Sequence, residues 1–167
     1  GFADYAFVDP ALTDSMPSRL SVAVGLDAMT HAMESLWGRH GNSFSNTLAT
    51  RALELLQAEL PQVIDAPTQQ SRNGMTLGAL LAGMALSTTR SAIAHALSYQ
   101  LTGEHNIEHG LAVGLIALAV FKLPIEEAPQ ERARVVQACG RESAEELVEF
   151  LETNFRNIGM TTSLSRL

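Results

Sequence analysis

The sequence predicts an all-α fold in which helices pack as a bundle around one hydrophobic core. The first observation is composition: 46% of the 167 residues are hydrophobic, only 5% are aromatic, and leucine and alanine are plentiful. Such residues favour helices, whereas strands are enriched in aromatic and β-branched side chains. The second observation is that apolar residues recur at helical spacing along most of the chain, without internal repeats or low-complexity tracts.

The first residues do not follow this helical pattern. The stretch YAFVDP (residues 5–10) predicts a short N-terminal strand, and no partner strand follows it in the sequence. We therefore expect residues 1–15 to form this strand and an interdomain segment, and residues 16–167 to form an all-helical domain. An unpartnered strand and the lack of an initiator methionine lead us to expect a piece of a larger protein.

The first two helices have recognisable ends. One is expected to begin near Pro17, which suits a first helical turn, and to end at the break GRHGNS (residues 38–43). Ser45 is predicted to cap a second helix, which Pro61 would end.

The rest of the chain continues the helical pattern. A capping box of Ser143 with Glu146 opens the last helix, and Gly159 ends it. The polar stretch TGEHNIEHG (residues 102–110) is predicted to be a loop. The five predicted helical segments are residues 75–89, 91–101, 111–121, 128–140 and 143–159.

Charge and cysteine content exclude some classes of protein. The net charge of −7 and the scattering of the 11 basic residues argue against nucleic-acid binding, which needs clustered Lys and Arg. The single cysteine, Cys139, rules out an intramolecular disulfide and fits a cytoplasmic protein. The longest apolar run, Leu111 to Phe121, is shorter than the ~20 residues of a membrane span, so we expect no membrane insertion.

The stretch GLDAMTHAMES places a carboxylate and an imidazole on one helical face. Asp27 and His31 are four residues apart, so their side chains point to the same place. They are either a hydrogen-bonded pair in the core or half of a metal site. His95, in an apolar helix, and His109, at the start of the next, would complete a shell of one carboxylate and three imidazoles. The alternative is a set of separate buried histidines with ordinary hydrogen bonds.

Two stretches resemble one known family. VDPALTDSMPSRLSVAVGLDAMTHAMES and IAHALSYQLTGEHNIEHGLAVGL are similar to the C-terminal helical half of the iron-dependent (group III) alcohol dehydrogenases. The similarity runs from about Tyr5 to Phe121, and it implies the helical domain of a dehydroquinate synthase-like fold. It also implies that four residues hold Fe²⁺, or Zn²⁺ in some members: Asp27, His31, His95 and His109.

The resemblance implies an oxidoreductase that transfers hydride between a nicotinamide cofactor and an alcohol or aldehyde bound to the metal. NAD or NADP would be held mainly by a nucleotide-binding domain that is absent from this chain, since no glycine-rich phosphate loop follows a strand here. Met16 and Leu20 are the predicted nicotinamide contacts within the chain. The full-length protein would be a homo-oligomer (a dimer).

The chain departs from the family pattern at Tyr99, where the family has a second histidine near the substrate and nicotinamide. Tyr99 is therefore either a catalytic residue or an ordinary core tyrosine. His105, four residues before His109, is either a substitute metal ligand or a solvated loop residue, and His40 is expected to be exposed.

The sequences SYQLT and MESLWGRHGN resemble the branch that acts on phosphonoacetaldehyde-type substrates, and Arg90 could then meet an anionic group. Two other functions stay open. One is a non-catalytic helical metal-binding domain. The other is a metal-activated hydrolase, for which Glu34 is the best-placed general base.

Overall fold

The computed structural model describes residues 4–123 and 129–163, and every regular element in these ranges is helical. The all-α prediction is therefore confirmed for the described part of the chain. A 3₁₀ helix, η1, comes first, and seven α-helices follow. The elements are η1 (Pro10–Thr13), α1 (Ser18–Trp37), α2 (Ser43–Asp65), α3 (Gln69–Thr89), α4 (Ile93–His105), α5 (His109–Lys122), α6 (Pro129–Ala138) and α7 (Ala144–Asn157).

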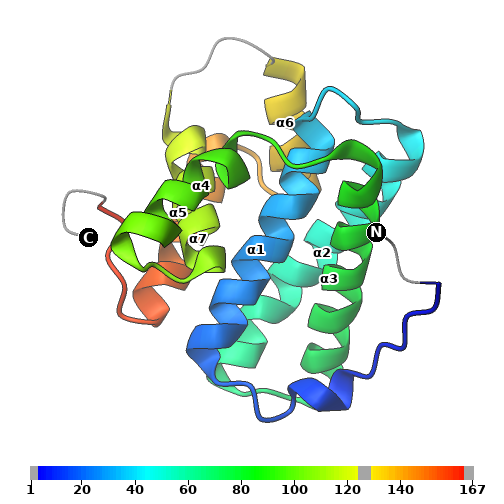
Figure 1. Cartoon of the computed structure of the whole chain (residues 1–167), viewed down its shortest axis with the longest axis vertical. Helices are drawn as coiled ribbons and strands as arrows, with labels where there is room; N and C mark the ends of the chain where they lie inside the picture. The colour runs from blue at the N-terminus through cyan, green and yellow to red at the C-terminus, as the bar shows by residue number, and fades with distance from the viewer. Residues whose placement is uncertain (1–3, 124–128, 164–167) are drawn as a thin grey trace.

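Helix α1 is the centre of the bundle (Figure 1). Helices α2 and α3 pack against one side of it, and α5 packs against the other. Helices α4 and α7 in turn pack against α5. Leu26, Met29 and Met33 of α1 are fully buried, as expected for a helix covered on several sides. Polar side chains in the middle of α1, such as those of Thr30 and Glu34, are therefore buried in the core.

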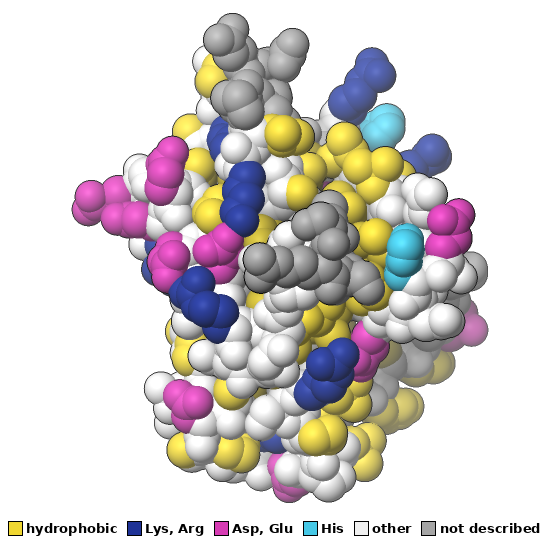
Figure 2. Space-filling view, turned by 90° about the vertical axis from the view of Figure 1, so that its left-hand side faces the viewer, with side chains coloured by type: hydrophobic (Ala, Val, Ile, Leu, Met, Phe, Trp, Pro, Cys, Tyr) yellow, Lys and Arg dark blue, Asp and Glu magenta, His cyan; other side chains and the backbone are white. Residues whose placement is uncertain are grey.

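Surface composition is mixed. On the face shown in Figure 2, acidic and basic side chains are interspersed, and hydrophobic side chains reach the surface between them. Among the described helices, no single one is long and apolar enough to cross a membrane. Taken together, the described helices α3 and α4 reach the required length and hydropathy, but that pair is bent by 109°.

The predicted N-terminal strand is not formed. Residues 4–9 have no regular structure, and Tyr5 and Phe7 are 85% and 96% exposed. A strand is stable only when its backbone pairs with a neighbour, and the described residues contain no other strand. Residues 1–3 of this predicted segment, and residues 164–167 of the predicted domain, lie outside the described ranges.

Two predicted helix ends are also wrong. Pro61 does not end α2, which continues to Asp65 because Leu60 and Val63 are buried in the core and hold the last turn in place. The N-terminal cap of α2 is Asn42 and not the predicted Ser45: the Asn42 side chain accepts hydrogen bonds from the backbone N–H groups of residues 44 and 45.

The predicted polar loop at residues 102–110 is mostly helical. Helix α4 continues to His105 and ends at Asn106, whose left-handed φ of 53° turns the chain. Helix α5 begins directly afterwards at His109, so the loop is only three residues long.

Helix α5 packs backbone to backbone on α1. A Cβ atom at Gly110 would lie 2.1 Å from the carbonyl oxygen of Ala23, which is far inside van der Waals contact. Glycine is therefore needed for this close packing, which also fixes the position of the preceding residue, His109.

We expect Gly110→Ala to lower the free energy of unfolding by about 1–3 kcal/mol, the usual cost of overpacking. The matched control is Gly103→Ala on α4, where a Cβ would meet nothing within 4 Å. That control should instead stabilise the protein by about 0.5–1 kcal/mol, because alanine is the better helix former. Urea denaturation measures both, and equal effects of the two substitutions would contradict the packing argument.

Candidate metal centre

Three helices bring the four predicted ligands together. Asp27 and His31 come from α1, His95 from α4, and His109 is the first residue of α5. One carboxylate oxygen, Oδ1 of Asp27, lies 3.2 Å from Nε2 of His95, 3.5 Å from Nε2 of His31 and 3.9 Å from Nε2 of His109. All three imidazoles thus turn the same ring nitrogen toward one oxygen.

These distances fit a shared metal ion. Ligand atoms that lie about 2.0–2.2 Å from a tetrahedral ion are about 3.3–3.6 Å from one another. The His31 distance of 3.5 Å lies in this range, that of His95 is 3.2 Å and that of His109 is 3.9 Å. The ligand atoms of Asp27, His31 and His95 all lie within 4.8 Å of one another. His109 is the outermost member and needs the largest shift to join them.

The cluster is closed on one side and open on the other. The side chain of His95 is only 5% exposed, those of Asp27 and His31 are 25% exposed, and that of His109 is 42% exposed. Catalytic metal sites keep one coordination position open, whereas structural sites are enclosed. The open side near His109 is where a substrate could reach a bound ion.

Glu34 fixes the orientation of His95. Its side chain is fully buried, and it accepts hydrogen bonds from Nδ1 of His95 at 2.8 Å and from the backbone N–H groups of Ala92 and Ala94 at 2.6 and 2.7 Å. Ala92 is the N-cap of α4 and has no capping side chain, so a carboxylate from α1 takes that role. With Nδ1 donating to Glu34, Nε2 is left facing Asp27.

Burial and charge act against each other in this cluster. Burial raises the pKa of Asp27, but the hydrogen bond with His95 and the nearby imidazoles outweigh it and hold this pKa below its usual value. Glu34 behaves in the same way, with His95 and the Ala92 N–H as its main partners. Both carboxylates are therefore ionised at neutral pH.

The pKa values of the His31 and His95 imidazoles shift in opposite directions. Burial lowers the pKa of His31, and the Asp27 charge only partly offsets this. Burial also disfavours protonation of His95, but Asp27 and Glu34 on its two sides raise its pKa to about 9. The rings of His31 and His95 stack with centroids 4.6 Å apart, so two charged imidazoles there would repel each other.

Tyr99 is not a core residue. Its side chain is on α4, one turn after His95, and the residue is 64% exposed. Its ring stacks on that of His109, with centroids 6.1 Å apart and an interplanar angle of 19°. Of the two alternatives for Tyr99, the ordinary core tyrosine is therefore wrong, and the phenol lies beside the open side of the cluster.

The predicted cofactor contacts lie apart from the ligand cluster. Leu20 is 38% exposed on α1, seven residues or about 10 Å before Asp27 along the helix. Met16 precedes α1 and lines an apolar cavity. His40, Arg90 and His105 are exposed, and His105 is not among the clustered ligand atoms.

The sequence showed Glu34 only as a possible general base. Its actual partners are 58 to 61 residues away in the chain, so spacing could not reveal them. The signal that was available is an acidic residue in an otherwise apolar helix, which needs a partner when buried. Since its oxygens already accept hydrogen bonds from four N–H groups, Glu34 is poorly placed to accept a proton from water.

We expect Glu34→Gln to weaken metal binding about 10- to 100-fold, because a neutral amide orients and polarises His95 less well. The control is Glu104→Gln, at an exposed position on α4, the helix that carries His95; it should leave the affinity unchanged. Competition between the protein and a chromophoric chelator for Zn²⁺ measures the affinity. An unchanged affinity in a folded Glu34→Gln variant would contradict the role of Glu34.

The comparisons with known proteins identify the family of this chain. Residues 21–167 match the model of the Fe-containing alcohol dehydrogenase family, C-terminal. The chain is 33% identical over 142 residues to 1-propanol dehydrogenase PduQ of Salmonella typhimurium; this alignment covers 83% of the chain and 38% of the relative. It is 32% identical over 171 aligned residues to long-chain-alcohol dehydrogenase 1 of Geobacillus thermodenitrificans, where the alignment covers 97% of the chain and 43% of the relative.

Solved structures share the fold. A sulfoacetaldehyde reductase from Bifidobacterium kashiwanohense, in complex with NAD⁺, superposes with a TM-score of 0.86 at 25% identity, covering 95% of this chain and 42% of that one. An iron-containing alcohol dehydrogenase from Thermotoga maritima gives 0.81 at 34% identity, covering 90% and 42%. The chain spans less than half the length of each of these proteins. It belongs to the iron-containing alcohol dehydrogenase family, of which it represents the C-terminal helical part.

Proposed function

We propose that this chain is the metal-binding half of a metal-dependent alcohol dehydrogenase or aldehyde reductase, with residues 16–167 as its catalytic helical domain. The observation that carries the proposal is the convergence of three imidazole nitrogens on Oδ1 of Asp27, in a chain of this family. The reaction would transfer hydride between NAD or NADP and the carbon of an alcohol or aldehyde.

The residues present fit a divalent ion, Fe²⁺ or Zn²⁺, held by Asp27, His31, His95 and His109. When bound, the ion would act as a Lewis acid that stabilises negative charge on the substrate oxygen. The protein's own part is positional: Glu34 holds the ring of His95, and the packing at Gly110 holds α5, which starts at His109.

Tyr99 is the proposed catalytic residue supplied by this chain. Its hydroxyl belongs to an exposed ring stacked on His109, so a substrate entering from the open side would pass beside it. A phenol can both donate and accept a hydrogen bond, and it could therefore bind the substrate oxygen where the family has a histidine.

The nicotinamide cofactor would be bound mainly by protein outside this chain, with Met16 and Leu20 as the proposed contacts within it. We also propose an anionic aldehyde of the phosphonoacetaldehyde type as the substrate. A sulfoacetaldehyde reductase of Bilophila wadsworthia is 33% identical over 117 residues, which supports a small aldehyde with an anionic group. Exposed Arg90, between α3 and α4, is the candidate partner of that group.

Metal content is the first test. We expect purified protein to bind one equivalent of Fe²⁺ or Zn²⁺, and Asp27→Ala or His95→Ala to lose it, because each substitution removes one ligand. Asp65→Ala, at an exposed carboxylate at the end of α2, should keep the metal. Elemental analysis after dialysis measures this. Equal metal content in all variants would remove the basis of the proposal.

Activity of the full-length protein is the second test. Alcohol-dependent reduction of NAD⁺ or NADP⁺ should be present in the metal-loaded protein, and kcat/KM should fall by about 100-fold or more in Asp27→Ala. The absorbance of the reduced nicotinamide reports the reaction. Metal binding without any dehydrogenase activity would instead favour the non-catalytic metal-binding domain.

A further inference from the structure

A second candidate site lies between α1, α2 and α3, under the N-terminal segment. It is an apolar cavity of about 390 Å³, within the range of about 300–1,000 Å³ that is usual for small-molecule sites. Val8, Thr13 and Met16 of the N-terminal segment line one side of it, and it is open to solvent near Val8, Val24 and Leu80, which are 47%, 43% and 37% exposed. Most of its other walls are aliphatic, from Val24 of α1, Leu56 and Val63 of α2, and Met75, Ala79 and Leu80 of α3.

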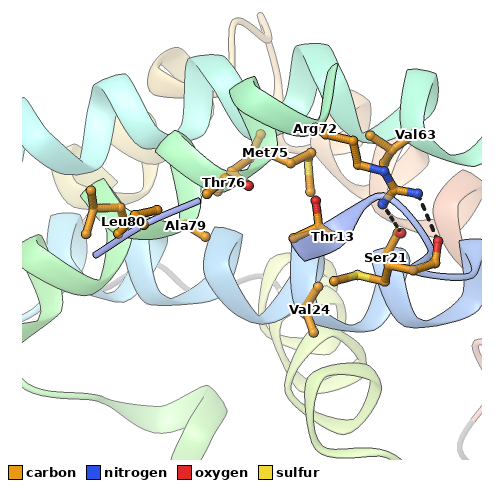
Figure 3. A pocket seen from close by; sticks show the side chains of 12 residues that line it. Thr13, Ser21, Val24, Val63, Arg72, Met75, Thr76, Ala79 and Leu80 are labelled. Carbon is orange, nitrogen blue, oxygen red and sulfur yellow. Dashed lines mark hydrogen bonds between the residues drawn. The ribbon is translucent and has the colours of Figure 1, made fainter. Parts of the chain in front are cut away.

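One charged group lines this cavity. In Figure 3, Arg72 lies at one end, hydrogen-bonded to Ser21, while Met75, Thr76, Ala79 and Leu80 extend along α3 to the other end. Arg72 is only 4% exposed, so its charge is almost completely removed from water.

The charge of Arg72 has no anionic counterpart in the described part of the chain. Its Nη atoms donate to two neutral acceptors, the Ser21 hydroxyl at 2.9 Å and the Met16 carbonyl at 2.8 Å, and its buried Nε has no partner. Asp14 lines a neighbouring surface hollow together with Arg72, but no ion pair joins these two described residues. A buried guanidinium without a carboxylate is costly, and an anion beside it would be correspondingly favoured.

We propose that this cavity binds an amphipathic monoanion, a small molecule with one carboxylate or sulfonate and an apolar body. The anionic end would lie beside Arg72, forming charge-assisted hydrogen bonds, and the apolar body would lie along Met75, Ala79 and Leu80. A neutral ligand would leave the Arg72 charge uncompensated, and a small inorganic anion would leave the aliphatic walls empty.

This site does not depend on the proposed metal chemistry. Its lining residues include none of the four clustered ligands. Met16 is shared with the proposed nicotinamide contacts, so competition with NAD⁺ must be tested directly.

The probe is decanoate, titrated into the full-length protein by calorimetry, with 1-decanol as the neutral ligand of equal length. We expect one decanoate per chain, bound at least about tenfold more tightly than 1-decanol. Arg72→Met should weaken decanoate binding by about 10- to 100-fold, since it removes the charge. No measurable decanoate binding by the unmodified protein would overturn the proposal, as would equal affinity for 1-decanol.

Arg72 also holds the Met16 carbonyl, so Arg72→Met could unfold the protein. A second variant, Ala79→Phe, fills the cavity from its wall and leaves Arg72 in place; it should abolish decanoate binding. Its control is Gln70→Phe, an exposed position on α3 that does not line the cavity, which should bind like the unmodified protein. Unchanged binding in Ala79→Phe, or displacement of decanoate by NAD⁺, would overturn the proposal. Metal content, measured in the same samples, reports separately on the proposed function.

Discussion

The buried carboxylate of Glu34 is the interaction on which the candidate site depends. It joins the central helix α1 to the start of α4, and it does so by replacing the N-terminal cap that Ala92 cannot supply. The same oxygens bind the ring of His95, so one group sets both the direction of α4 and the orientation of His95, a proposed metal ligand. A charged side chain in a core is tolerated only when its hydrogen bonds are satisfied, and Glu34 meets this condition.

The third helix of the site is held by a different constraint. Gly110 lets the backbone of α5 contact the backbone of α1 at Ala23, one turn before Asp27. Side chains can shift between rotamers, but two backbones in contact cannot, so the start of α5 and His109 with it are held firmly. This rigid contact between α5 and α1 thus fixes the backbone at the open side of the site, although the His109 side chain itself is partly exposed.

The recurrence of apolar residues at helical spacing predicted most of the helices, including α5, which is buried on nearly all sides from Gly110 to Leu118. It failed where tertiary packing overrides local signals: α2 passes through Pro61, and α4 continues across a polar stretch to His105. The four-residue spacing of Asp27 and His31 was enough to predict that their side chains lie together on one helical face. Spacing does not show that His95 and His109 join them or that Glu34 supports His95, because these are contacts between distant segments of the chain.

The charges of the site favour a divalent ion over a proton. Asp27 and Glu34 together carry two negative charges next to the core, and their lowered pKa values keep both ionised. Without a metal, protonated His95 supplies one positive charge between them, because its pKa is raised to about 9 from 6.5 for the free side chain. This charge stabilises the folded protein fully below about pH 6.5, and the stabilisation is lost as the pH rises through about 9. One proton balances only half of the negative charge, whereas a doubly charged ion held by neutral imidazoles would balance all of it.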